Sequence, residues 1–331
     1  MKKILIIQTA FPGDAILTLP MIQTLWKNNP DCIIDVIAIP TTSDIFSSSP
    51  YVSNVIVYDK RGKNKSVLSL LKFASDLRKN KYDVLYSPHR SFRTALIVLL
   101  SRVKDSYGFD ISSLSWVYKS KVKYERSFHE VKRNLSLIGK SEIDWMIKPQ
   151  MNLPDPKNLL QNIPTSELVA LAPGSVWETK KYPVEKFRQI VSELCEKKYF
   201  ILLLGGKDDH DLCEKLNIMP NTQTMNLAGK LSIIESTSVL TNCKLLISND
   251  SAPTHMGMAA DIPVLTIYCS TIPGFGFYPY NSKSFSLTYN DLECKPCGIH
   301  GHQKCPEGTF ECAHKLNPSL VMDKIMEILG S

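Results

Sequence analysis

The chain has 331 residues, of which 44% are hydrophobic and 21% are charged. These fractions are ordinary for a globular protein with a full-sized core, and the length predicts two domains of about 100–200 residues each. No stretch approaches the roughly 18 uncharged apolar residues of a membrane span, and the apolar run at 4–7 is too short for a signal peptide. We therefore expect a cytoplasmic protein.

The net charge of +7 is unevenly distributed along the chain. Residues 1–150 carry 23 Lys and Arg against 13 Asp and Glu, whereas residues 151–331 carry 16 against 19. The basic excess is either an ordinary solvated surface or a face for an anionic partner, such as a membrane surface or a phosphorylated molecule. Nucleic acid is not expected, because the sequence has no recognised nucleic-acid motif and no basic-aromatic platform.

Apolar runs alternate with helical patterns in the first half. Strands are expected at 3–8, 33–39, 55–58 and 84–87, with helices at 15–28 and 67–78. This βαβ order predicts a parallel sheet with helices on both faces. The segment 150–166 contains three prolines and little periodicity, which is typical of a linker.

The same alternation restarts after the linker. Strands are expected at 168–172, 200–204, 245–248 and 264–268, with helices at 184–197, 208–216, 253–260 and 320–329. We predict two doubly wound, Rossmann-like α/β domains, 1–155 and 165–331, that face one another across a cleft at the carboxyl ends of their sheets. Packing of the final helix back on the first domain is an option that the sequence leaves open.

Three turns at strand ends of the second domain are suited to a nucleotide. "LAPGSVWETKKYP" carries Gly174 and Lys180, "LLLGGKDD" carries Gly205, and "LLISNDSAPTHMGMAA" carries Asn249 to Ser251 before a helix. Glycines let the backbone approach a ligand, and free amides at a helix start favour an anion such as pyrophosphate. Each turn alone is common in α/β proteins, but three in one domain indicate a nucleotide site.

The first turn of the chain differs from these. "QTAFPGDAILTLP" links a strand to a helix as a phosphate loop would, but it ends in Asp14, whose charge would repel a phosphate. The sequence leaves two interpretations of Asp14 open. It is either the N-cap of the following helix or a general base. An NAD-dependent dehydrogenase is disfavoured, since no G-x-G-x-x-G follows the first strand.

Together, "QTAFPGDAILTLP", "LAPGSVWETKKYP" and "ISNDSAPTHMGMAADIPVLTIY" resemble the ADP-heptose:lipopolysaccharide heptosyltransferases of glycosyltransferase family 9. "HRSFRTALI" and "FHEVKRNLSLIG" are similar to family segments of the first domain, and the resemblance runs in order over about residues 1–320. One departure is Ala252, where the family loop often has glycine. The resemblance implies the GT-B fold and an inverting, metal-independent transferase.

The resemblance also implies substrates and partners. The donor would be ADP-L-glycero-D-manno-heptose, and the acceptor the inner core of lipopolysaccharide, either Kdo-lipid A or heptosyl-Kdo-lipid A. The protein would then be a monomer bound peripherally to the inner face of the inner membrane. Two alternatives stay open: a family-9 transferase with another nucleotide sugar or glycan acceptor, and a nucleotide-sugar-binding module without turnover.

Roles follow for individual residues of the matching motifs. Asp14 would be the catalytic base, and Lys180 would contact the donor phosphates and stabilise the charge on departing ADP. The other donor-binding residues implied are Gly174, Ser175, Gly205, Asp208, Asp209, Leu231, Asn249, Asp250, Ser251 and His255. The acceptor-binding residues expected in the first domain are Gly13, Arg90, Arg93 and His129.

A cysteine cluster lies late in the chain. "CKPCGIHGHQKCPEGTFEC" brings four cysteines into one loop, with three histidines nearby. In a cytoplasmic chain this clustering favours thiolates over disulfides, and a C-x-x-C pair fits zinc, although the second pair is spaced more loosely. Two interpretations stay open, a structural zinc site and a loop of reduced or redox-labile thiols. The zinc ligands would be Cys294, Cys297, Cys305 and Cys312.

Overall fold

A computed structural model describes residues 1–161, 163 and 167–330. The chain divides into two compact units, unit 1 from Met1 to Asn152 and unit 2 from Leu153 to Ser331. The change of unit falls inside the expected linker, three residues before the predicted end of the first domain. The predicted start of the second domain, residue 165, lies outside the described residues.

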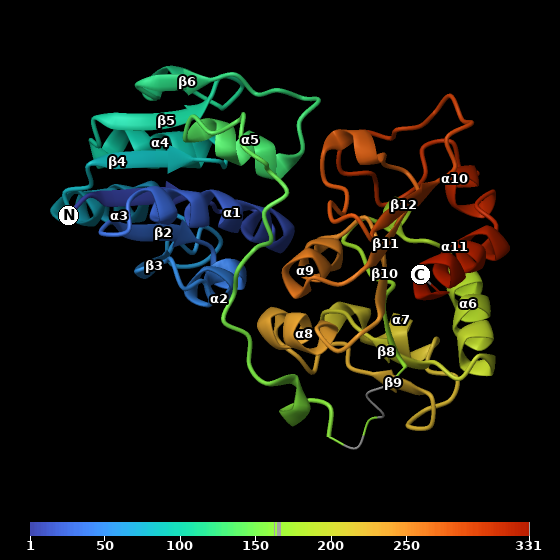
Figure 1. Ribbon diagram of the computed structural model, residues 1–331. Helices are drawn as coiled ribbons and strands as arrows, with labels where there is room; N and C mark the ends of the chain where they lie inside the picture. The colour runs from blue at the N-terminus through green and yellow to red at the C-terminus, as the bar shows by residue number, and fades with distance from the viewer. Residues whose placement is uncertain (162, 164–166, 331) are drawn as a thin grey trace. The chain divides into compact units, whose positions relative to one another are not determined.

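Unit 1 contains a six-stranded parallel sheet in the order β3-β2-β1-β4-β5-β6 (Figure 1). Strand β1 is a continuous apolar run whose residues after Lys3 are all buried, as expected of a strand covered on both faces. The strands are β1 (Lys3–Ile7), β2 (Ile33–Ala38), β3 (Asn54–Val57), β4 (Val84–Ser87), β5 (Asp105–Phe109) and β6 (Ser120–Val122).

Helices cover both faces of this sheet. Helices α1, α2 and α5 pack together on one face, and α3 and α4 pack side by side on the other, as right-handed crossovers require. The helices are α1 (Pro12–Asn28), α2 (Ser43–Ser47), α3 (Val67–Lys79), α4 (Phe92–Ser101) and α5 (Glu130–Leu137), with short 3₁₀ turns η1 (Pro40–Thr42) and η2 (Ser115–Val117).

Unit 2 repeats the plan, with a six-stranded parallel sheet in the order β12-β11-β10-β7-β8-β9. The strands are β7 (Leu168–Ala172), β8 (Phe200–Leu203), β9 (Thr224–Asn226), β10 (Leu245–Asn249), β11 (Val264–Tyr268) and β12 (Phe285–Thr288). The 3₁₀ turns are η3 (Pro156–Asn158), η4 (Glu178–Lys180), η5 (Lys207–Asp209) and η6 (Pro273–Phe275).

The helices of unit 2 also lie on both faces of their sheet. Helices α8 and α9 pack together, and α11 packs against α6 over the main apolar core. The final helix therefore contributes to the core of unit 2. The helices are α6 (Val184–Glu196), α7 (His210–Glu214), α8 (Ile233–Leu240), α9 (Ala252–Ala260), α10 (Glu311–His314) and α11 (Pro318–Gly330).

Each sheet has a point where the strand order reverses, between β1 and β4 in unit 1 and between β7 and β10 in unit 2. In doubly wound sheets, ligands bind outside the carboxyl ends of the strands at this switch point. The predicted turns after β1, β7 and β10 lie there, and the Gly205 turn follows the neighbouring strand β8. Among the described residues, no helix has the length and apolar character needed to cross a bilayer.

Candidate active site

Asp14 lies in the first turn of α1, at the switch point of unit 1. The helix begins at Pro12, which suits the first helical position because proline fixes φ and needs no amide partner there. Phe11 is the N-cap and no side chain caps the helix. The interpretation of Asp14 as an N-cap is therefore wrong, because the helix starts three residues before the predicted position 15.

The Asp14 carboxyl has a pKa raised from 3.8 to about 7. Desolvation is the main cause, and the negative charge of Glu130 on α5 adds to it. Backbone hydrogen bonds at Phe11 and Asp14, together with the positive charge of Arg90, oppose the rise. A carboxyl with this pKa is half ionised near neutral pH, which suits a general base.

A buried ion pair on α5 faces this part of α1. Arg133 Nη1 donates to Glu130 Oε2 at 2.8 Å, and both side chains are almost inaccessible to solvent. One turn further along α5, Asn134 Nδ2 donates to the carbonyl oxygen of Leu17 at 3.1 Å, which ties the two helices together. Helix α5 therefore holds Glu130 where it affects the Asp14 carboxyl.

The four acceptor-binding residues expected from the sequence have different surroundings. Gly13 is buried beside Asp14, and Arg90 lies 4.3 Å from the ring centroid of Tyr124 with its charge acting on Asp14. Arg93 instead donates to the carbonyl oxygens of Asn64 and Lys65. The structure thus brings Gly13 and Arg90 together with Asp14.

His129, the remaining acceptor-binding prediction, is buried. Its Nδ1 accepts the Val131 amide at 3.2 Å and caps α5, and its ring stacks on Trp145.

One residue at the switch point of unit 1 was not predicted from the sequence. This residue is His89, which follows β4. His89 Nδ1 is 2.9 Å from Thr9 Oγ1 and 2.7 Å from Thr94 Oγ1, and desolvation lowers its pKa to about 4. The sequence feature that could have pointed to His89 was its position just after a buried strand.

In unit 2, Lys180 and Asp250 form an ion pair at the switch point between β7 and β10. Lys180 Nζ is 2.7 Å from Asp250 Oδ2, and their side chains are only 12% and 11% exposed. The same carboxylate oxygen accepts the Thr271 hydroxyl at 2.6 Å. An ammonium group has three donors, so the lysine can bind a phosphate oxygen while it remains paired with Asp250.

The neighbouring polar residues connect the loops of this site. Asn249 Oδ1 accepts the Tyr182 amide, and Asn249 Nδ2 donates to the carbonyl oxygen of Pro173. The Ser251 hydroxyl is 3.3 Å from the carbonyl oxygen of Gly174. These bonds join the loop after β10 to the loop after β7. Ser251 is the N-cap of α9, but its side chain makes no capping bond.

Asp209 brings the glycine turns together. Its Oδ2 accepts the Gly206 amide at 2.9 Å. Its carboxylate lies where a Cβ on Gly174 would stand, and its own Cβ lies 2.6 Å from where a Cβ on Gly205 would stand. Both positions therefore need glycine because of close packing. With the bond between Ser251 and Gly174, the three predicted nucleotide turns thus converge in one place.

The other residues predicted to bind the donor have different surroundings from the residues of these turns. Asp208 is exposed, Ser175 Oγ accepts the Trp177 amide, and Leu231 is half-buried directly before the N-cap of α8. His255, on α9, is 4% exposed, and its Nδ1 has no hydrogen-bond partner among the residues that the structure describes. Desolvation lowers the His255 pKa to about 4, so the ring is neutral at pH 7.

We expect a Gly174→Ala substitution to be costly. A Cβ there would stand 2.2 Å from Asp209 Oδ1, which must move and release the Gly206 amide. Overpacking of this kind costs about 1–3 kcal/mol, and the turn would lose its shape for phosphate. Thermal unfolding and ADP titration measure both effects. Gly274→Ala is the control, since its nearest neighbouring atom is 3.5 Å away; equal losses in both variants would contradict the assignment.

The cysteine-rich loop packs behind Lys180. The Thr179 amide donates to the His302 carbonyl oxygen, and the His302 amide donates to Thr179 Oγ1. The Cys297 amide donates to the carbonyl oxygen of Ser270, whose own amide donates to Thr179. Gly301, with φ of +76°, has the hydroxyls of Thr179 and Ser270 where its Cβ would point. The loop therefore fixes the 3₁₀ turn that carries Lys180.

The four cysteines of this loop have unequal surroundings. Cys294 is exposed and Cys312 is buried, where desolvation raises the Cys312 pKa to about 11. Over the part of the chain that the structure describes, no group of three or more His, Cys, Asp or Glu side chains could hold a metal ion. The charges of Cys294, Cys297 and Cys305 nevertheless contribute to the raised pKa of Cys312, so the four thiols lie in one neighbourhood. A structural zinc site and a loop of reduced thiols therefore both stay predictions.

The two doubly wound parallel sheets, each with polar residues at its switch point, define the GT-B class of glycosyltransferase folds. The family model of glycosyltransferase family 9 (heptosyltransferase) matches residues 70–307. The chain belongs to this family and is a glycosyltransferase.

Known relatives cover most of the chain. Lipopolysaccharide heptosyltransferase 3 of Escherichia coli is 27% identical over 277 residues, 79% of this chain and 82% of that protein. The family 9 glycosyltransferase of Veillonella parvula gives a TM-score of 0.87 at 20% identity, covering 99% of this chain and 97% of the other. The E. coli heptosyltransferase WaaC with ADP-2-deoxy-2-fluoro heptose gives 0.73 at 21% identity, covering 98% and 99%. At these identities the structural similarities establish the fold.

Proposed function

We propose that the protein transfers heptose from ADP-L-glycero-D-manno-heptose to the inner core of lipopolysaccharide, at Kdo-lipid A or heptosyl-Kdo-lipid A. Membership of the heptosyltransferase family supports the reaction class. A relative named lipopolysaccharide heptosyltransferase and a similar structure that holds an ADP-heptose analogue support the acceptor and the donor. The largely buried ammonium of Lys180 at the switch point of unit 2 is the observation that carries the donor assignment.

The proposed reaction inverts the anomeric configuration. Asp14 accepts the proton of an acceptor hydroxyl, and the resulting oxygen attacks the anomeric carbon on the face opposite the nucleotide. The bond between that carbon and the β-phosphate oxygen breaks, and ADP leaves with the electron pair. Gly13 allows close approach of the acceptor, and Arg90 offers a cation to its anionic groups. Arg93 and His129 support the same acceptor region through the loop and helix that they hold.

Charge on the departing ADP is stabilised by this chain's own residues in the proposed mechanism. Lys180 donates to the diphosphate, and Asp250 keeps its ammonium group in place. The unpartnered Nδ1 of His255 and the amide groups around Gly174, Gly205 and Ser251 complete the donor site. We propose that this arrangement acts without a metal ion.

Purified protein, ADP-heptose and Kdo-lipid A or heptosyl-Kdo-lipid A test the proposal directly. We expect release of ADP together with a heptosylated lipid detected by mass spectrometry. Turnover with a different nucleotide sugar and none with ADP-heptose would reassign the donor. Nucleotide binding without turnover on any acceptor would instead favour a binding module. We further propose a monomer at the cytoplasmic face of the inner membrane, which sedimentation and fractionation test.

Adenine nucleotides are expected to stabilise the protein selectively. A ligand at about 100 times its Kd raises the free energy of unfolding by about 2.7 kcal/mol, which moves the Tm by several degrees. ADP should therefore shift thermal unfolding in a concentration-dependent way, whereas UDP at the same concentration should not. An equal shift with UDP would contradict an adenine-specific donor site.

A further inference from the structure

Exposed apolar side chains gather where α3 and α4 begin. Val67, Leu68 and Leu71 on α3 are 71%, 79% and 45% exposed, and Phe92 at the start of α4 is 55% exposed. The inner side of α3 uses other residues, Leu70, Ala74 and Leu77, to fill the core. The outer residues therefore contribute little to the fold, and their exposure has another explanation.

A basic turn directly precedes this apolar group. The carboxylate of Asp59 accepts the amides of Arg61, Gly62 and Lys63, which fixes the turn in one conformation. Arg93 at the start of α4 donates to the carbonyl oxygen of Asn64 at 3.0 Å and ties the turn to that helix. The basic side chains are thus presented beside Phe92 and the first turns of α3.

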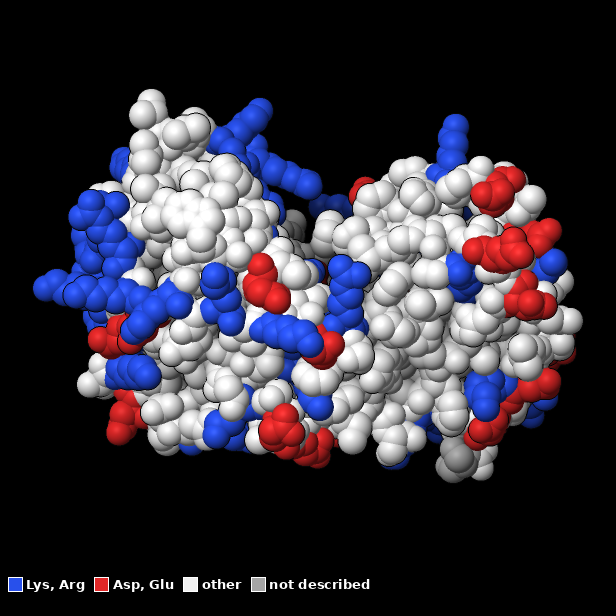
Figure 2. Space-filling view, turned by 90° about the horizontal axis from the view of Figure 1, so that it is seen from above, with Lys and Arg blue, Asp and Glu red and all other residues white. Residues whose placement is uncertain are grey.

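The basic side chains here form no close ion pair, although Asp59 and Asp76 interact electrostatically with Lys63 and Lys72. Arg61, Lys63, Lys65 and Lys72 are exposed, and none of the salt bridges found among the described residues includes them. Figure 2 shows how densely Lys and Arg cover part of the surface of unit 1. We call the following set the docking surface: Arg61, Lys63, Lys65, Val67, Leu68, Leu71, Lys72 and Phe92.

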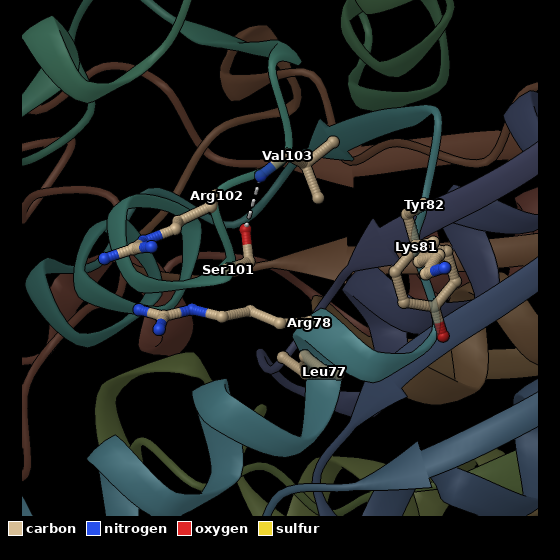
Figure 3. Close-up of a pocket in the computed structure, with 7 residues that line it drawn as sticks. All are labelled: Leu77, Arg78, Lys81, Tyr82, Ser101, Arg102 and Val103. Atoms are coloured by element: carbon tan, nitrogen blue, oxygen red, sulfur yellow. Dashed lines mark hydrogen bonds between the residues drawn. The ribbon is translucent and has the colours of Figure 1, made fainter.

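The same helix pair is also basic at its other end. A cavity of about 170 Å³ there is lined by residues that include Arg78, Lys81 and Arg102 (Figure 3). The side chains of Arg78 and Arg102 lie side by side in this view, and Arg78 Nε donates to the carbonyl oxygen of Leu100. No ion pair among the described residues compensates either guanidinium. This second basic group lies at the opposite end of the two helices and is not part of the docking surface.

The docking surface lies at the same edge of the unit 1 sheet as Asp14, the proposed base for the acceptor hydroxyl. It follows β3, and Phe92 follows β4, so both sit at the carboxyl end of the sheet, as Asp14 does. Lys60 Nζ donates to the carbonyl oxygen of Thr9 at 2.8 Å, which links the basic turn to the loop that leads into α1. A partner bound here would be held near the proposed base.

We propose that the docking surface binds the surface of an anionic lipid bilayer, with the apolar side chains inserted among the lipids and the basic side chains at the phosphates. The inference rests on the proposed function, because an acceptor anchored in the lipid bilayer requires the enzyme to work at the bilayer surface. Apolar insertion and electrostatic attraction act together at such interfaces, and either alone gives weak, reversible binding. Charge complementarity selects the bilayer over a neutral protein partner.

Vesicle sedimentation of the full-length protein tests this proposal. Vesicles of phosphatidylethanolamine and phosphatidylglycerol are compared with vesicles of phosphatidylcholine alone, at low and high salt. We expect preferential binding to the anionic vesicles, at least tenfold weaker in the V67S/L68S/L71S variant. Lys63→Ser with Lys65→Ser should weaken binding severalfold at low salt and flatten its salt dependence.

A matched control carries Met219→Ser and Leu320→Ser, which remove exposed apolar side chains from unit 2. Its vesicle binding should equal that of the unsubstituted protein, and circular dichroism should show every variant folded. Undiminished binding of the triple variant, or an equal loss in the control, would overturn the proposal. Binding abolished by a soluble phosphorylated saccharide, with no dependence on the apolar residues, would likewise replace the bilayer with a free phosphate ligand.

Transfer to a short, deacylated acceptor separates this inference from the proposed function. That reaction needs no bilayer, so the triple variant should retain the full rate with it and lose rate only with acceptor in vesicles. Vesicle binding without transfer to either acceptor would contradict the proposed function but would still support bilayer binding by the docking surface. Equal losses with both acceptors would overturn the docking surface.

Discussion

Replacing Asp14 by asparagine is expected to lower kcat about 10²–10⁴-fold, because the substitution keeps the shape of the side chain and removes its basicity. In the unsubstituted enzyme, kcat/KM should rise with pH through about 7, since the carboxylate is the active form and its pKa is about 7. The measurement is ADP release over a range of pH. A rate that persists in the variant would contradict the assignment of the base.

Glu130 provides a sharper test of the same electrostatics. A Glu130→Gln substitution removes the negative charge that raises the Asp14 pKa, so the rise in kcat/KM should move to lower pH. Asp44→Asn, an exposed carboxylate on α2, is the matched control and should leave the profile in place. A profile unmoved by Glu130→Gln would contradict the assigned effect of Glu130 on the carboxyl that controls the rate.

Ionisation of Asp14 with rising pH should increase activity but lower the stability of the fold. Because its native pKa is raised, the folded state holds the proton between pH 3.8 and about 7, and stability falls as pH rises through that window. At pH 8, Asp14→Asn should therefore be more stable than the unsubstituted protein, by about 2 kcal/mol. The full shift corresponds to about 4 kcal/mol, which partial solvent access reduces. Urea unfolding at acidic and alkaline pH measures the difference.

Replacing Lys180 by alanine is expected to reduce kcat about 10²–10³-fold, through lost stabilisation of the departing ADP. The variant also leaves the Asp250 carboxylate buried without its ion partner, which costs about 3–5 kcal/mol of stability. Loss of activity and loss of folding must therefore be separated. Steady-state kinetics and thermal unfolding of the same preparations give the two quantities.

The Lys180→Ala, Asp250→Asn double variant makes that separation. Asparagine has no charge to leave unpaired, so the double variant should recover most of the stability but none of the activity. Lys181→Ala is a second control, because Lys181 pairs with the exposed Glu178 and an exposed pair contributes about 0–1 kcal/mol. Recovery of activity in the double variant would show that Lys180 acts only through folding.

The sequence predicted the architecture because buried parallel strands are continuous apolar runs. Strands β1, β7 and β11 were evident for that reason, whereas β6 and β9 were not. Each of these two has only three residues, and polar side chains dominate them. Such edge strands form because a neighbouring strand offers hydrogen bonds, and local sequence carries little trace of that.

The candidate site was predictable in its motifs but not in its contacts. Asp14, Lys180 and Asp250 stand in recognisable turns, so their positions followed from the sequence. The effect of Glu130 on Asp14 crosses 116 positions of the chain, and no spacing rule reports it. Arg93 and His129 show the same difficulty, since their polar atoms contact other parts of the chain.

The pairing of Thr179 with His302 has a consequence for synthesis of the protein. These two residues are 123 positions apart, and Tyr182 Oη donates to the carbonyl oxygen of Leu316, 134 positions away. A nascent chain that has reached α10 has all of β7 to β12 but has not yet supplied every support of the lysine turn. Chains truncated before the cysteine-rich loop would lack the backbone partners of Thr179 and Tyr182, so we expect them to have no functional nucleotide site.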